Sequence, residues 1–240
     1  MKALEAFNLK FTGLNKNEIL QKIKEGHFQV VLTVNAEFIV LANENKRFKE
    51  ILDKYTTTID GQIPYFLLKM KYKNTHFEKI SGSEFIYDVC NIANELGLKV
   101  FLLGGLEESN ILAQKKLKEK YPNIKISGFS PPYSPYPFSK EHNENIINKI
   151  KAFSPDILFV AFGAPKQEFW IDDNIDFIRE IGIRFVMGVG GTFEIISGKE
   201  KPAPKIIKKV GLESVWRLIQ NPKRAKRFIR NFKIFKYWRY

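Results

Sequence analysis

The feature that most constrains the fold is the stretch 155–171, PDILFVAFGAPKQEFWI. Its apolar run, residues 157–162, does not alternate with polar residues, which indicates a strand buried on both faces, as in a parallel sheet covered by helices. The Gly-Ala-Pro triplet at 163–165 ends this strand, and proline suits the first turn of a following helix. Lys166 and Gln167 are therefore expected at the carboxyl edge of a sheet, where open α/β sheets bind ligands and free helix N–H groups favour phosphate. A polar helix start without a ligand fits the same residues, so this stretch alone does not establish a function.

Strand and helix patterns alternate through residues 1–200. Strands are predicted at 3–11, 30–34, 57–59, 99–103, 124–128, 157–162 and 184–187. Helices are predicted at 16–25, 36–43, 62–72, 82–96, 107–120, 140–153 and 175–181. This alternation predicts an α/β fold with a Rossmann-like, mainly parallel sheet and helices on both faces.

The basic charge is concentrated at the end of the chain. Residues 201–240 hold 13 of the 39 Lys and Arg residues but a single acidic residue, Glu213, of the 26 in the chain. Two basic helices, about 206–220 and 222–237, are predicted there as an appendage to the preceding domain of residues 1–200. Such asymmetry indicates a polyanionic partner, either nucleic acid or an anionic membrane surface.

Several classes of protein are disfavoured by composition. A single cysteine, Cys90, excludes an internal disulfide framework and fits a reducing compartment. Three scattered histidines offer no cluster of metal ligands, so neither a metal nor a cofactor is expected. The sequence has no N-terminal signal pattern and no apolar run long enough to cross a bilayer.

Polar or glycine-rich groups follow four of the predicted strands. They are Thr33 with Asn35, Gly104 with Gly105, residues 163–167, and residues 188–192 including Gly190 and Gly191. Such loops suit a diphosphate bound by backbone N–H groups, although a glycine pair also makes an ordinary turn. Asp60, which precedes Gly61, is the best placed lone carboxylate for acid–base chemistry, but an Asp-Gly pair is often only a turn.

Seven motifs occur together in one order. They are TVNAEFIVLA (33–42), DG (60–61), KISGSEF (79–85), FLLGG (101–105), PDILFVAFGAPKQEFWI (155–171), GVGGTFEIISGK (188–199) and APKIIKKVGLESVWRLIQNPKR (203–224). With these motifs the chain resembles the WecG/TagA/CpsF family of bacterial glycosyltransferases over nearly its whole length. Each motif is weak alone, but seven in order with matching spacing are highly specific.

The resemblance implies an inverting, metal-independent transfer of an N-acetylmannosamine-type sugar from a UDP donor. The implied acceptor is a polyprenyl-diphosphate-linked amino sugar at the cytoplasmic face of the bacterial membrane, in teichoic acid, common antigen or capsule synthesis. It also implies a peripheral enzyme whose residues 201–240 associate with the anionic membrane surface and with the active site. No nucleic acid is expected as a partner, and the oligomeric state, homo-oligomer included, stays open.

The resemblance also assigns roles to single residues. Asp60 is implied as the general base, with Thr33 and Asn35 near the donor sugar and the reacting centre. The residues implied in binding substrate or the leaving UDP are Gln167, Lys166, Lys79, Gly104, Gly105, Gly190, Gly191, Arg217, Arg224 and Arg227. Lys79 and Pro202 stand where the family often has arginine, and lysine lacks arginine's bidentate fork, so the phosphate or acceptor contact at Lys79 is in doubt.

Other classes of function stay open from the residues alone. A nucleic-acid-binding protein would use the basic tail, although no nucleic-acid-binding motif is visible and the rest of the chain lacks a basic surplus. A nicotinamide-dependent enzyme would need the complete GxGxxG fingerprint, which is missing. For the tail, the aromatic stripe of Phe228, Phe232 and Phe235 fits a membrane interface but also fits packing on the domain.

Overall fold

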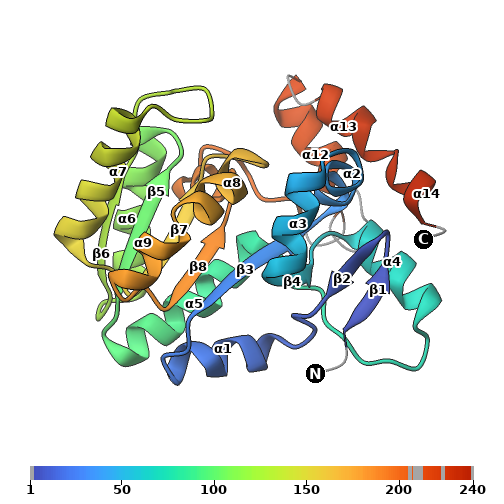
Figure 1. Cartoon of the computed structure of the whole chain (residues 1–240), viewed down its shortest axis with the longest axis horizontal. Helices are drawn as coiled ribbons and strands as arrows, with labels where there is room; N and C mark the ends of the chain where they lie inside the picture. The colour runs from blue at the N-terminus through green and yellow to red at the C-terminus, as the bar shows by residue number, and fades with distance from the viewer. Residues whose placement is uncertain (1–2, 205–206, 208–212, 223–224, 239–240) are drawn as a thin grey trace. The chain divides into compact units, whose positions relative to one another are not determined.

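The computed structural model describes residues 3–204, 207, 213–222 and 225–238. The chain divides into two compact units (Figure 1). Unit 1 comprises Met1–Lys16, Leu32–Ser81 and Glu200–Tyr240, and unit 2 comprises Asn17–Val31 and Gly82–Lys199. The C-terminal segment that begins at Glu200 therefore belongs to the same unit as the loops that follow β3 (Gln29–Val34) and β4 (Thr56–Ile59).

The main sheet has six strands in the order β4-β3-β8-β7-β5-β6. Their bounds are β3 Gln29–Val34, β4 Thr56–Ile59, β5 Lys99–Gly104, β6 Lys125–Phe129, β7 Ile157–Ala161 and β8 Phe185–Gly188. The pairs β3–β8, β8–β7, β7–β5 and β5–β6 are all parallel. Every residue of β7 is buried, as its unbroken apolar run predicts, and the α/β class with a mainly parallel sheet is confirmed.

Unit 2 holds the central strands and the helices around them. Its helices are α1 Lys16–Lys24 (from Asn17 on), α5 Gly82–Leu96, α6 Glu107–Lys120, α7 Lys140–Phe153, α8 Lys166–Asp173, α9 Ile175–Glu180 and α10 Thr192–Ser197. Helix α10 packs on α5 and α6, while α8 and α9 lie in front of the strands in Figure 1. The register pairs Gly104 with Ala161, and Val160 with Gly188, so β5, β7 and β8 end at nearly the same level. Three loops therefore leave the same edge of the sheet side by side.

Unit 1 is built around helices α2 and α3. Its elements are the antiparallel pair β1 Leu4–Ala6 and β2 Leu9–Phe11, then α2 Ala36–Glu44, α3 Lys46–Lys54, β4, α4 Gln62–Lys71, α12 Glu213–Gln220, α13 Ala225–Asn231 and α14 Ile234–Tyr237. A single residue, Asn45, separates α2 from α3. Both α13 and α14 pack on α2.

Three elements of unit 1 differ from the sequence prediction. Residues 3–11 form two strands instead of one, because Phe7 and Asn8 both take positive φ and reverse the chain. Helix α3 is not predicted at all. The predicted helix at 222–237 is interrupted after α13, where Phe232 and Lys233 donate their backbone N–H groups to carbonyls three residues back.

Candidate active site

In unit 1 the carboxyl ends of β3 and β4 are joined directly. The backbone N–H of Asp60 donates to the carbonyl oxygen of Val34 at 2.9 Å. Asp60 thus lies at the end of β4, next to the segment Thr33–Asn35 that ends β3. Gly61 follows with φ of +83°, a conformation that glycine adopts without strain and that turns the chain sharply into α4. The predicted base and the predicted Thr-Asn pair are therefore neighbours.

Asn35 begins helix α2. Its side-chain oxygen accepts hydrogen bonds from the N–H groups of Glu37 at 3.0 Å and Phe38 at 3.2 Å. This is an N-cap, which satisfies two helix donors that otherwise have no intrahelical partner. Thr33, two residues earlier, is buried within β3. The cap fixes the Asn35 side chain at the strand end, where it remains partly exposed.

Lys79 completes this group in unit 1. It forms an isolated parallel bridge with Ile59, and the next residue, Ile80, donates its N–H to the Ile59 carbonyl at 2.8 Å. The Lys79 ammonium donates to the side-chain oxygen of Gln62 at 3.1 Å. Its charge is therefore held beside the Asp60-Gly61 turn by the first residue of α4, a partner that the sequence did not reveal.

The C-terminal segment is attached to α2 by charges. The Arg230 guanidinium lies 3.1 Å from a Glu37 carboxylate oxygen, and the Glu37 side chain is 6% exposed. Lys233 pairs with Glu44, at the other end of α2, at 2.6 Å. Neither pair was predicted, because each joins positions nearly 200 residues apart in the sequence.

The predicted tail arginines are described only in part. Arg217 lies in α12 and Arg227 in α13, but the side chains of both lie outside the described residues, as does the whole of Arg224. Their predicted contact with the leaving diphosphate stays a prediction.

In unit 2 the sheet topology has a switch point between β5 and β7. Strand β5 is followed by β6 on one side of it, whereas β7 is followed by β8 on the other side. The connections from two adjacent parallel strands therefore run in opposite directions, and open α/β sheets bind ligands outside the carboxyl ends of such a pair. The residues at this point are Gly104 and Gly105 after β5 and the Gly163 loop after β7.

Gly104 and Gly105 are needed for close packing. A Cβ on Gly104 would lie 2.8 Å from the Phe162 ring, and one on Gly105 would lie 3.0 Å from the Phe193 ring. The N–H of Gly105 donates to the Ala161 carbonyl, and the N–H of Leu106 donates to a Glu194 carboxylate oxygen. These N–H groups already have partners within the fold, so a phosphate at this loop would have to displace them.

Gln167 is enclosed in unit 2. Its side-chain oxygen accepts from the N–H groups of Gly163 and Gly190, both at 3.1 Å, and its side-chain nitrogen donates to Glu168 at 2.7 Å. Only 3% of Gln167 and 1% of Glu168 are exposed. Gly191 follows as the N-cap of α10. The predicted contact between Gln167 and the donor stays a prediction, but the amide has a defined role within the fold.

Lys166 begins α8 beside an aromatic loop. Its ammonium donates to the Ser134 carbonyl at 3.1 Å and lies 4.9 Å from the centre of the Tyr133 ring and 5.6 Å from that of Phe138. Burial lowers the pKa of Lys166 from the ordinary lysine value, because desolvation disfavours the charged form. A partly desolvated cation at the start of a helix is suited to bind an anion.

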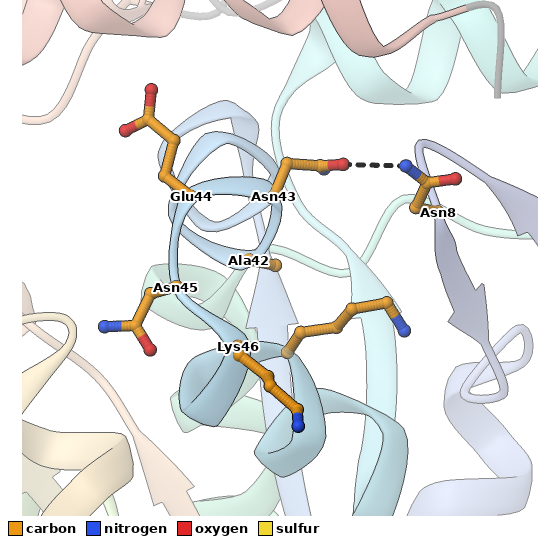
Figure 2. A pocket seen from close by; sticks show the side chains of 7 residues that line it. Asn8, Ala42, Asn43, Glu44, Asn45 and Lys46 are labelled. Carbon is orange, nitrogen blue, oxygen red and sulfur yellow. Dashed lines mark hydrogen bonds between the residues drawn. The ribbon is translucent and has the colours of Figure 1, made fainter.

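A hollow in unit 1 does not coincide with the predicted site. It has a volume of about 620 Å³ and is lined by Asn8, Ala42, Asn43, Glu44, Asn45, Lys46 and Lys49 (Figure 2). In Figure 2 the side chains of Asn8 and Asn43 point toward one another, and Asn8 donates to Asn43 at 2.9 Å. The hollow lies at the end of α2, whereas Asn35 caps its start.

The part of the chain that the structure describes has neither a cluster of metal ligands nor a membrane-spanning helix. Within these ranges, no group of three or more His, Cys, Asp or Glu side chains is placed to hold a metal ion. In the same part of the chain, no helix combines the length and the apolar character that crossing a bilayer requires.

The fold defines an α/β protein whose polar and glycine residues gather at the carboxyl ends of its strands. The family model for the glycosyl transferase WecG/TagA/CpsF family matches residues 4–239, and the chain belongs to this family of glycosyltransferases.

Curated relatives carry one name. An N-acetylglucosaminyldiphosphoundecaprenol N-acetyl-beta-D-mannosaminyltransferase of Staphylococcus aureus strain MW2 is 29% identical over 207 residues, covering 86% of this chain and 78% of the relative. The protein of the same name in strain MRSA252 is 28% identical, and the match covers the same fractions of this chain and of the relative. This chain is thus similar to mannosaminyltransferases over most of both sequences.

Proposed function

We propose that this protein transfers an N-acetylmannosamine-type sugar from a UDP donor to an N-acetylglucosamine carried on a polyprenyl diphosphate. The family match over residues 4–239 and the activity for which the relatives are named support the reaction class. The product would enter a cell-surface polysaccharide such as teichoic acid, common antigen or capsule. The observation that carries the proposal is the cluster at the ends of β3 and β4, where Asn35 and Asp60 follow two joined strands and Lys79 forms a bridge with Ile59 of β4.

Asp60 is proposed as the general base. The attacking hydroxyl of the acceptor must lose a proton as it bonds to the anomeric carbon, and a carboxylate at that point accepts it. Direct attack of this kind displaces the leaving UDP from the opposite face and inverts the configuration. The sharp turn at Gly61 and the hydrogen bond from the Asp60 N–H hold the carboxylate at the strand end.

The charge that develops on UDP is proposed to be stabilised by cationic side chains without a metal ion. Arg217, Arg224 and Arg227 are proposed to supply guanidinium groups, whose planar fork suits phosphate oxygens.

A membrane-facing role is proposed for the C-terminal segment. Phe232 is 57% and Phe235 is 54% exposed, in a segment rich in lysine and arginine, while Ile234 between them is buried. Exposed aromatic rings among cations are suited to the headgroup region of an anionic membrane, where the acceptor lipid resides. The protein would then act as a peripheral enzyme at the cytoplasmic face.

A donor screen tests the reaction. Purified protein is incubated with a panel of UDP-sugars and a soluble N-acetylglucosaminyl diphospholipid analogue, with and without EDTA. We expect one N-acetylmannosamine-type donor to give a disaccharide by mass and a β-linkage by NMR, unchanged by EDTA. Retained configuration would exclude direct attack, loss of turnover with EDTA would exclude a metal-independent mechanism, and no product from any UDP-sugar would reject the proposed reaction.

Liposome sedimentation tests the membrane role. Replacing Phe232 and Phe235 together by serine should reduce binding to vesicles containing phosphatidylglycerol. Phe66→Ser is the matched control, since Phe66 is 61% exposed on α4 of the same unit. Equal binding of the double variant and the wild type would exclude these rings as the membrane contact.

A further inference from the structure

We propose that Gln167 is a positioning residue: its carboxamide joins the loops after β7 and β8 and sets the backbone that faces the donor, without itself touching the donor. The inference deepens the proposed function and rests on it for its donor-binding readout. The motivating geometry lies entirely within unit 2.

The first argument is that the side-chain oxygen of Gln167 bonds to two different loops. One oxygen accepts two backbone N–H groups, from Gly163 on one loop and Gly190 on the next, each at 3.1 Å. These donors come from the ends of two neighbouring parallel strands, β7 and β8. One oxygen therefore joins the two loops.

The second argument is burial. With 3% exposure, Gln167 has almost no surface to offer a ligand, and its nitrogen is oriented by the carboxylate of Glu168 at 2.7 Å. A buried amide with its oxygen and nitrogen both engaged is costly to rotate, because each broken bond leaves a buried polar group unsatisfied. The orientation of the amide is thereby fixed before any ligand binds.

The third argument is the glycine at the end of β8. A Cβ on Gly188 would lie 2.5 Å from the Gln167 nitrogen and 2.9 Å from a Glu168 oxygen. Gly188 has no positive φ, so its backbone conformation does not require glycine. The space that a side chain at position 188 would take is filled by the Gln167 and Glu168 side chains. Gly188, Gln167 and Glu168 therefore form one packed cluster.

The chemistry of the pair gives a distinctive test. A carboxylic acid at position 167 would reproduce the amide, with one oxygen accepting from the glycines and an O–H donating to Glu168. A carboxylate would lose that donor and face Glu168 with like charge, and one of two adjacent carboxyls then retains a proton to higher pH. At acidic pH, Gln167→Glu should therefore bind UDP nearly as tightly as the wild type does. At alkaline pH it should bind UDP about tenfold or more weakly than the wild type does at the same pH.

The experiment measures two properties of the full chain. Amide hydrogen exchange by NMR reports the Gly163 and Gly190 N–H groups without any ligand, and calorimetry reports UDP affinity across pH. The variants are Gln167→Ala, Gln167→Glu and the control Gln114→Ala, whose amide donates to Asn110 on α6 in the same unit.

We expect Gln167→Ala to lose protection at both glycines and to bind UDP at least tenfold more weakly, with Gln114→Ala unchanged in both. UDP should leave the protection of the two glycines in the wild type the same or higher. Unchanged protection in Gln167→Ala would overturn the proposal, and so would a UDP-induced loss of protection in the wild type, which would mean that the donor displaces the amide. If UDP does not bind the wild type at all, the proposed function fails while the exchange measurement still decides the role of Gln167.

Discussion

Two side-chain amides at strand ends show how one sequence signal serves two purposes. Asn35 in unit 1 and Gln167 in unit 2 each follow a buried strand, and each accepts hydrogen bonds from two backbone N–H groups. Asn35 caps the helix that it begins and stays partly exposed, whereas Gln167 joins two separate loops and is enclosed. A polar residue after a strand therefore marks either a ligand contact or a loop support, and burial separates the two.

The largest expected effect tests the chemical role of unit 1. Asp60→Asn should slow transfer by about 10²–10⁴-fold, the usual contribution of a general base, with UDP affinity and melting temperature nearly unchanged. Steady-state kinetics with the soluble acceptor measure the rate. Asp156→Asn is the control, because Asp156 binds Arg184 and the Lys99 N–H at the opposite end of the strands. It should lower stability and leave the rate per folded molecule intact; equal turnover in Asp60→Asn and wild type would remove Asp60 as the base.

A pair of cap variants separates ligand contact from helix support. Asn35→Ala and Asn45→Ala each remove an N-cap, the second from α3, and each should cost about 1 kcal/mol in the free energy of unfolding. Only Asn35→Ala should also reduce transfer, by about 10–100-fold, the worth of one hydrogen bond to a charged group. Urea unfolding and kinetics on the same samples give both numbers. If the two variants lose activity equally, Asn35 acts only as a cap.

Crowding the cluster of Gly188, Gln167 and Glu168 should lower both the stability and the UDP affinity of unit 2. Gly188→Ala forces a methyl group against the Gln167 nitrogen and should lower stability by about 1–3 kcal/mol and weaken UDP binding by about tenfold. Gly182→Ala is the control, since Gly182 has φ of +81° but open space around it. It should cost roughly 1–2 kcal/mol in stability and leave UDP affinity unchanged. Equal UDP affinity in both variants would argue against the link between packing and donor binding.

The smallest expected effect concerns the charge of Lys166. Its pKa is lowered by burial, so the ammonium loses its proton at a lower pH than an ordinary lysine at 10.5. UDP affinity should therefore fall by roughly two- to fivefold as pH rises through that lowered pKa, since a solvent-screened charge pair contributes about 1 kcal/mol or less. Lys166→Arg keeps its charge and should bind UDP equally well over the same range. A wild-type profile as flat as that of the arginine variant would exclude Lys166 as an anion contact.

Long elements with clear periodicity were predictable from the sequence. Helices α6 and α7 begin and end where predicted, and β7 follows its apolar run. Helix α3 was missed because Asn45 is both the C-cap of α2 and the N-cap of α3. No stretch with the composition of a loop therefore separates the two helices. The β1–β2 turn carries Phe7-Asn8 without the glycine that usually marks such a turn.

The positions in the candidate site were predictable only in part. Asp60 and Asn35 could be named because each follows a predicted strand, whereas Lys79 was named only through the resemblance to the family. Three contacts depend on which distant segments meet, and the local sequence pattern does not predict such meetings. They are the bond from Lys79 to Gln62, the pair of Arg230 with Glu37 on α2, and the bonds from two loops to Gln167. The resemblance to the family implies that Gln167 contacts the donor, and the structure shows the hydrogen bonds that its amide makes within the fold.

The attachment of the C-terminal segment to α2 has a mechanical consequence. Arg230 and Lys233 bind the two ends of that helix, and the Trp238 ring lies 5.4 Å from that of Phe7, whose carbonyl accepts from Asn43 on the same helix. If Phe232 and Phe235 make the proposed membrane contact, the load from the lipid surface is carried by α2, whose first residue, Ala36, directly follows Asn35.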